Sequence, residues 1–167
     1  MLKPPFRIVA ECYADTLMVS SILNSLKVEH AFGIPEVAKV MAKAKKEEHI
    51  IGVVDNDKEK RIPPYLLNFR TKYINNRVIL KDNLPANQFL LVLDKAVESF
   101  ILWNVEQVNL DISQYGFPLV PKLLGRRLKY EYIDTDADFQ LVLAELKNRQ
   151  APGFITLENI LNDFLTP

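Results

Sequence analysis

Cysteine and histidine are scarce in this chain of 167 residues, and their scarcity excludes two kinds of site. The single cysteine, Cys12, rules out an internal disulfide framework and a multi-cysteine zinc site, and it fits a reducing compartment. The two histidines, His30 and His49, lie far apart in the sequence, and neither has a partner four residues away. A helix that binds zinc through two histidines is therefore absent as well.

Long apolar runs and an excess of charge are also missing. No stretch approaches the roughly 20 apolar residues of a membrane helix. The first seven residues contain two prolines and an arginine where a signal peptide would need an apolar run. We therefore expect a cytoplasmic protein without a membrane partner. The 21 basic and 21 acidic side chains balance, so no global field attracts nucleic acid, although a local patch would suffice.

The length and the 49% hydrophobic content are typical of one globular domain, here residues 1–167. Strand and helix patterns alternate in the first half: strands at 6–10, 28–32 and 49–54, and helices at 15–26 and from 35 onward, with Asp15 as the expected N-cap of the first helix. This order predicts an α/β fold of Rossmann-like type, with a mostly parallel sheet flanked by helices.

The second half is less regular. We expect a loop at 55–64, a strand at 77–80, a strand at 89–93 and a helix at 95–105. Two further amphipathic helices are predicted at 138–149 and 156–165, which makes residues 106–167 a mainly helical C-terminal extension.

Carboxylates follow two of the predicted strands directly. Glu11 comes after the first strand, and Asp55 and Asp57 come after the third. Parallel strands end at the same edge of a sheet, where open α/β folds bind ligands, so these side chains are expected to meet there. Carboxylates brought together repel one another, and Mg²⁺ or Mn²⁺ suits such an all-oxygen site.

A structural explanation competes with this one. The Asp55-Asn-Asp57 segment has good turn chemistry, and acidic residues at strand ends often act as caps. A glutamate that ends an apolar strand is harder to explain in this way, because glutamate is neither a turn former nor a preferred cap. The combination favours a metal site.

Two segments resemble the Toprim family. Ile8-Val-Ala-Glu11-Cys-Tyr-Ala-Asp15 is similar to its first motif, a strand that ends in glutamate and is followed four residues later by aspartate. Ile50-Ile-Gly-Val-Val-Asp55-Asn-Asp57 is similar to its second, a strand that ends in Asp-x-Asp. The nearest likeness is to the small stand-alone and OLD-nuclease-like subgroup. The resemblance implies a Toprim-like core at residues 5–105.

The resemblance also implies a magnesium-dependent phosphoryl-transfer protein, a nuclease or phosphodiesterase that acts on nucleic acid. Glu11 would be the catalytic acid/base or a metal ligand. The implied metal ligands are Glu11, Asp55, Asp57 and, at the start of a later helix, Glu98. The basic residues after the second motif, Lys58, Lys60 and Arg61, are candidates for phosphate contacts. Together with Asp15 from the first motif, they make up the expected substrate-binding set.

Other interpretations stay open at this point. Cys12 stands where the family usually has glycine, and this favours a catalytically inactive Toprim-like accessory module with a protein partner, a nucleic-acid partner or a second copy of the chain. Asp-x-Asp also occurs in manganese-dependent nucleotide-sugar transferases. Asp134, Asp136, Asp138 and Glu145 match part of a calcium-loop template, but Phe139 occupies its glycine position, so an N-cap at Asp136 or Asp138 is the better explanation.

Overall fold

The computed structural model describes residues 6–24, 27–56 and 60–166, and within these ranges it contains a six-stranded sheet and six α-helices. The strands are β1 (Phe6–Ala10), β2 (Glu29–His30), β3 (His49–Asp55), β4 (Arg70–Asn75), β5 (Val78–Asn83) and β6 (Gln88–Leu93). The helices are α1 (Tyr13–Leu23), α2 (Ile34–Lys43), α3 (Val97–Gln107), α4 (Pro121–Leu128), α5 (Ala137–Asn148) and α6 (Pro152–Leu165).

The sheet is mixed, with the strand order β2-β1-β3-β6-β5-β4. Strand β1 pairs in parallel with β2 and β3, and β3 pairs in parallel with β6. Strand β5 is antiparallel to both of its neighbours, β4 and β6. The α/β class and the mostly parallel sheet predicted from the sequence are therefore confirmed, and the architecture fits a Rossmann-like fold.

The β4–β5 hairpin lies at one edge of the sheet and contains the strand that the sequence did not predict. Both residues of its turn, Asn76 and Arg77, have positive φ angles of 47° and 66°, as the tight turns favoured in hairpins require. All six residues of β4 are exposed, so the strand lacks the alternation of apolar and polar residues that identifies a half-buried strand. The predicted strand at 77–80 is β5, which begins one residue later.

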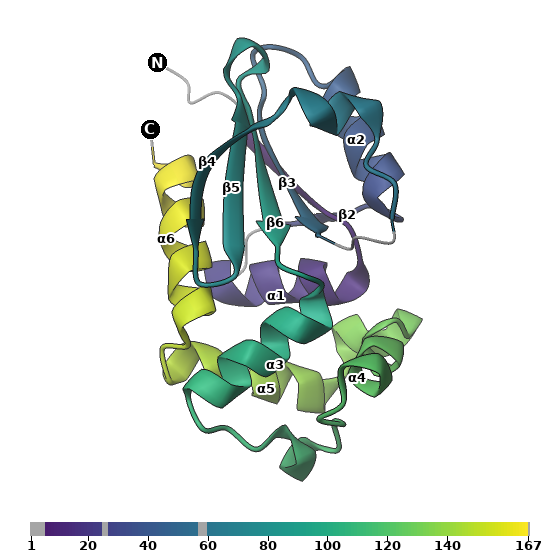
Figure 1. Ribbon diagram of the computed structural model, residues 1–167, viewed down its shortest axis with the longest axis vertical. Coiled ribbons are helices and arrows are strands. Elements are labelled where there is room, and N and C mark those ends of the chain that lie inside the picture. The colour runs from purple at the N-terminus through teal and green to yellow at the C-terminus, as the bar shows by residue number, and fades with distance from the viewer. Residues whose placement is uncertain (1–5, 25–26, 57–59, 167) are drawn as a thin grey trace.

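The sheet separates two apolar layers (Figure 1). Helix α2 covers one face, and α1 and α6 cover the other. In β3, Ile51 and Val53 belong to the core beneath α1 and α6, whereas Ile50 and Val54 belong to the core beneath α2. A strand buried on both faces appears in the sequence as a continuous apolar run, which explains why β3 was easy to recognise.

The C-terminal helices share the larger core with the first half of the chain. Residues of α5 and α6 pack in the same apolar cluster as residues of α1, α3, β1 and β3. Helix α6 begins at Pro152, earlier than the predicted 156, because proline is well tolerated in the first turn of a helix, where its missing N–H is not needed. The division into a core at 5–105 and an extension at 106–167 stays a prediction.

Candidate functional site

Glu11 follows directly after β1 and is held at the edge of the sheet by its backbone and its side chain. Its N–H donates to the carbonyl of Val53 at 3.0 Å, which extends the pairing of β1 with β3. The side chain is only 4% exposed. Its Oε2 accepts a hydrogen bond from the N–H of Asp55 at 2.9 Å, and its Oε1 accepts one from the Lys60 Nζ at 2.7 Å. The carboxylate is thus fixed in place at the carboxyl end of β1.

Asp15 lies in the first turn of α1 and is completely buried. The helix begins at Tyr13, and its N-cap is Cys12, so the predicted N-cap role of Asp15 is wrong. The helix predicted at 15–26 is confirmed with different bounds, since it starts two residues earlier and ends at Leu23; residues 25 and 26 lie outside the described residues. The Asp15 N–H donates to the Cys12 Sγ at 3.4 Å, and the Cys12 thiol donates to the Asp15 Oδ2 at 2.9 Å. This reciprocal pairing resembles a capping box, and it turns the Asp15 carboxylate toward the end of β1.

Asp55 ends β3 and completes a group of carboxylates that we call the acidic cluster: Glu11, Asp15 and Asp55. Among the described residues, each of the three offers a carboxylate oxygen that lies within 4.8 Å of those offered by the other two. Within the same part of the chain, the Asp15 Oδ1 and the Asp55 Oδ1 are buried and have no hydrogen-bond partner. Buried carboxylate oxygens are normally satisfied, so these two atoms are candidate ligands for a cation.

The pKa values of two carboxyl groups in the acidic cluster are raised. Burial raises the pKa of Asp15 to about 7, and the hydrogen bond from Cys12 opposes this shift only in part. Burial, with the charges of Asp15 and Glu11, raises the pKa of Asp55 to about 9, although Lys60 acts to lower it. Without a cation, the site therefore reduces its negative charge by retaining protons on carboxyl groups that are ordinarily ionised at neutral pH.

Residues of the acidic cluster fit a hard divalent cation. The donors are all carboxylate oxygens, which is the chemistry preferred by Mg²⁺ and Mn²⁺. A small pocket of about 40 Å³ is lined by one member of the cluster, Asp55, together with Lys60 and Lys81. Its volume exceeds the roughly 10–15 Å³ that one water molecule needs, so water can reach the Asp55 side of the cluster.

The other predicted site residues occupy different positions. Asp57 and Lys58 lie outside the described residues. Lys60 contacts Glu11, and Arg61 is exposed nearby in sequence. Glu98 lies outside the acidic cluster, in the first turn of α3, and a Cβ added at Gly125 would stand 3.0 Å from its Oε1. Its charge nevertheless contributes to raising the pKa of Asp55, so it stays a predicted ligand.

Sequence reasoning assigned Asp15 to substrate binding and missed its place among the carboxylates. The signal was present: a helix that starts at Tyr13 directs the side chain of its third residue back toward the end of the preceding strand. The alternative to a calcium loop is confirmed, because Asp136 is the N-cap of α5 and accepts the Phe139 N–H at 3.0 Å.

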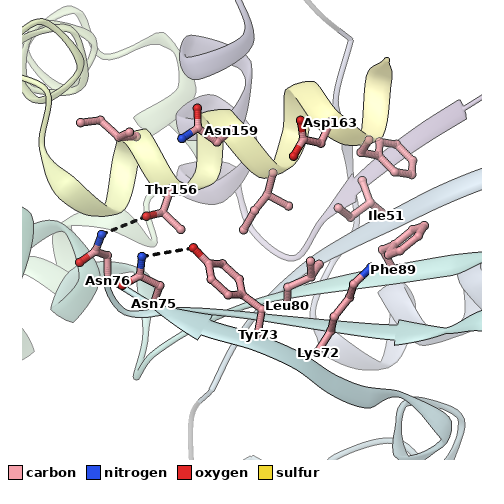
Figure 2. Close-up of a pocket in the computed structure, with 13 residues that line it drawn as sticks. Ile51, Lys72, Tyr73, Asn75, Asn76, Leu80, Phe89, Thr156, Asn159 and Asp163 are labelled. Atoms are coloured by element: carbon pink, nitrogen blue, oxygen red, sulfur yellow. Dashed lines mark hydrogen bonds between the residues drawn. The ribbon is translucent and has the colours of Figure 1, made fainter. Parts of the chain in front are cut away.

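A second and larger pocket lies between α6 and the β4–β5 hairpin, and we call it the α6 pocket (Figure 2). Its volume is about 670 Å³. Figure 2 shows two hydrogen bonds among its polar side chains: Asn76 donates to the Thr156 hydroxyl at 3.1 Å, and Asn75 donates to the Tyr73 hydroxyl at 3.2 Å. The acidic-cluster residues do not line it.

Comparisons with known proteins give no match: no protein-family model, no curated protein and no solved structure is significantly similar to the chain. None of the helices in the described ranges is both long enough and apolar enough to cross a membrane. The geometry and chemistry of the acidic cluster are therefore the features of the molecule that bear on its function.

Proposed function

We propose that this protein is a Toprim-like, magnesium-dependent phosphoryl-transfer protein, a nuclease or phosphodiesterase that acts on nucleic acid. The observation that carries the proposal is the fully buried Asp15, whose Oδ1 has no partner within the described residues and which lies beside Glu11 and Asp55. If these carboxylates served only as helix caps or turn residues, their buried oxygens would be expected to accept hydrogen bonds from the backbone. Burying a carboxylate oxygen without a partner is costly, and a cation bound by the cluster would remove that cost.

Each carboxylate has a role in this proposal. Asp15 and Asp55 hold the ion, because their free oxygens are the ones that lack partners. Glu11 is the acid/base, since its Oε1 lies at the side of the cluster where Lys60 approaches from solvent. When bound, Mg²⁺ supplies a Lewis acid for a phosphoryl oxygen and neutralises part of the cluster's charge.

Basic side chains provide the complement to a phosphate. The Lys60 side chain is 45% exposed, and Lys81 lines the same small pocket as Asp55. Once a cation balances the carboxylates, the Lys60 ammonium is no longer needed to neutralise Glu11 and can contact a phosphate oxygen. With the exposed Arg61, the next residue in the chain after Lys60, these residues would supply the local positive charge that a chain of zero net charge needs in order to bind nucleic acid.

The proposal is tested by incubating plasmid DNA and single-stranded oligonucleotides with the purified chain in Mg²⁺, in Mn²⁺ and in EDTA. We expect cleavage that depends on the metal and is lost in Asp55→Asn. Glu36→Gln, which changes an exposed carboxylate on α2, is the matched control and keeps the activity. Metal-dependent cleavage that survives in Asp55→Asn would contradict the proposal.

A non-catalytic accessory module is the second candidate, and one observation favours it. Both oxygens of Glu11 already accept hydrogen bonds from the protein, and one of the donors is a cation. Calorimetric titration with Mg²⁺ separates the two functions. Binding with a stoichiometry near one, lost in Asp15→Asn, supports the enzyme, whereas wild-type protein that takes up no Mg²⁺ supports the module.

A further inference from the structure

Three aromatic side chains contact one another near the end of β1, and we call them the aromatic platform: Tyr13, His30 and Phe32. The Tyr13 and His30 rings are tilted by 35°, and Phe32 meets both of them edge-to-face, at 86° and 60°. The ring centroids of Tyr13 and His30 are 4.0 Å apart, those of His30 and Phe32 are 4.3 Å apart, and those of Tyr13 and Phe32 are 6.1 Å apart. Phe32 forms the outer end, because 73% of its surface is exposed. The platform is supported from inside the protein and open on its outer side.

The aromatic platform is tied to the same strand end as Glu11. Phe32 lies between two residues whose N–H groups bond to the end of β1: Ala31 donates to the Ala10 carbonyl at 2.8 Å, and Gly33 donates to the Glu11 carbonyl at 3.1 Å. Tyr13 is the first residue of α1, which also carries Asp15. The residues that carry the exposed ring and the acidic cluster are therefore joined through backbone hydrogen bonds where β1, α1 and the segment after β2 meet; Figure 1 shows β1, α1 and β2 close together at this edge of the sheet.

Packing does not explain the exposure of Phe32. Phenylalanines that serve the core, such as Phe100 and Phe139, are at most 1% exposed. His30 does not make the platform a charged surface either, because burial lowers its pKa, and the nearby Asp134 offsets this only in part. At neutral pH the platform thus presents a neutral aromatic face, which suits stacking on another flat ring.

We propose that Phe32, backed by His30 and Tyr13, stacks on one unpaired nucleobase of a strand whose phosphate lies at the acidic cluster, and so makes the site selective for single strands. This inference rests on the proposed function. Bases inside a duplex are already stacked on both faces, so an exposed ring gains contact only with a base that is free on one side. The basic Lys60 and Arg61 complement the phosphate, whereas the platform complements the base.

The test measures binding of a fluorescein-labelled single-stranded DNA and of the same sequence as a duplex, by anisotropy in Mg²⁺. The Glu11→Gln background slows cleavage during the titration. We expect Phe32→Ala to weaken single-strand binding by about 5- to 100-fold, which is the range for loss of one base–aromatic stack, and to change duplex binding by less than about 2-fold. Phe32→Trp should bind the single strand as tightly as the parent does. Its tryptophan fluorescence should be quenched more than that of the parent when the single strand is added.

Two controls distinguish loss of stacking from misfolding and from loss of non-specific apolar binding. Leu84 is 70% exposed on the short helix Leu84–Ala86, so Leu84→Ala removes a similar apolar surface elsewhere and should not change binding. Because Phe32 is exposed, Phe32→Ala should keep the parent's Tm.

Three outcomes overturn the inference. The first is equal weakening of single-strand and duplex binding in Phe32→Ala, and the second is no weakening at all. The third is an absence of any oligonucleotide binding, which would leave a protein partner as the occupant of the platform. Failure of the proposed function looks different. In that case the wild-type chain neither binds Mg²⁺ in calorimetry nor cleaves any strand, whereas failure of the platform alone leaves both of these properties intact.

Discussion

The acidic cluster and the α6 pocket differ in size and in how their polar groups are satisfied. The small pocket that Asp55 lines holds about 40 Å³, and the α6 pocket holds about 670 Å³. In the α6 pocket the amides of Asn75 and Asn76 donate to neighbouring hydroxyls. In the acidic cluster, within the described residues, buried oxygens of Asp15 and Asp55 have no donor, and both pKa values are raised.

The comparison shows that volume is a weaker indicator of chemistry than unsatisfied charge. The amides of Asn75 and Asn76 already have acceptors, so they do not require a ligand. Carboxylates that are buried together repel one another, and protons or a cation relieve that repulsion. Perturbed ionisation of this kind concentrates at functional sites, so the smaller region is the better candidate for the chemistry.

The largest expected effect contrasts one carboxylate from each region. Glu11→Gln should lower the rate of metal-dependent cleavage by about 10²- to 10⁴-fold, because it removes the group that handles the proton. Asp163→Asn, at the exposed lining of the α6 pocket, should leave the rate unchanged. Initial rates at saturating Mg²⁺ measure both. If the two substitutions had the same effect on the rate, the contrast between the regions would be lost.

The next effect concerns stability against pH in EDTA. The folded protein keeps protons on Asp15 and Asp55 up to pH values of about 7 and 9, whereas carboxyls of the unfolded chain release them near 3.8. The folded state therefore binds more protons over this range, and the stability of the metal-free protein should fall as the pH rises from about 4 to about 9. Thermal unfolding at pH 5 and pH 8 measures the difference.

Asp55→Asn removes the group with the larger shift and should flatten this pH dependence. At pH 8 in EDTA we expect its Tm to exceed that of the wild type, by about 2–4 °C for each kcal/mol of relieved repulsion. Asp163→Asn is the matched control, since Asp163 is exposed and should keep the wild-type slope. An unchanged slope in Asp55→Asn would show that the acidic cluster is not the source of the pH dependence.

A smaller stabilisation is expected from Mg²⁺ itself. At a concentration 100 times the dissociation constant, binding to the folded state alone adds about 2.7 kcal/mol. The gain should be larger at pH 8 than at pH 6, because the ion competes with the retained protons. Asp15→Asn should abolish it, while Asn159→Ala in the α6 pocket should keep it. Equal gains in both variants would place the ion elsewhere.

The smallest effect is expected for the α6 pocket. Asn159 is exposed, so Asn159→Ala should alter the free energy of unfolding by no more than about 0.5 kcal/mol and leave cleavage unchanged. Denaturant titration and the cleavage assay measure the two quantities. A clear loss of activity would make the larger pocket part of the functional site.

Much of the fold could be predicted because its central strands have distinctive patterns. The runs that became β1, β3 and β6 are buried on both faces, and their apolar sequences show this directly. Strand β4 could not be predicted, since it is exposed throughout and owes its place to the hairpin turn at Asn76 and Arg77. The start of α1 was predicted two residues too late, because its N-cap is Cys12, and cysteine is not a preferred N-cap residue.

The candidate site divides in the same way. Glu11 and Asp55 were predicted to meet because parallel strands end together, and the structure places them in contact through the Asp55 N–H. The role of Asp15 could not be predicted, because it depends on the first turn of α1 and on a thiol that caps it. The magnesium ion, the Toprim resemblance and the phosphoryl-transfer activity stay predictions.

The sequence by itself determined the alternation of strands and helices in the first half of the chain and the two strand ends at which carboxylates stand, since both follow from local periodicity and from chain direction. Only the tertiary structure decided that Asp15 joins them in a buried cluster and that Phe32 stays exposed beside it. Burial and the distances between side chains depend on packing among segments far apart in the chain, and no local pattern encodes them.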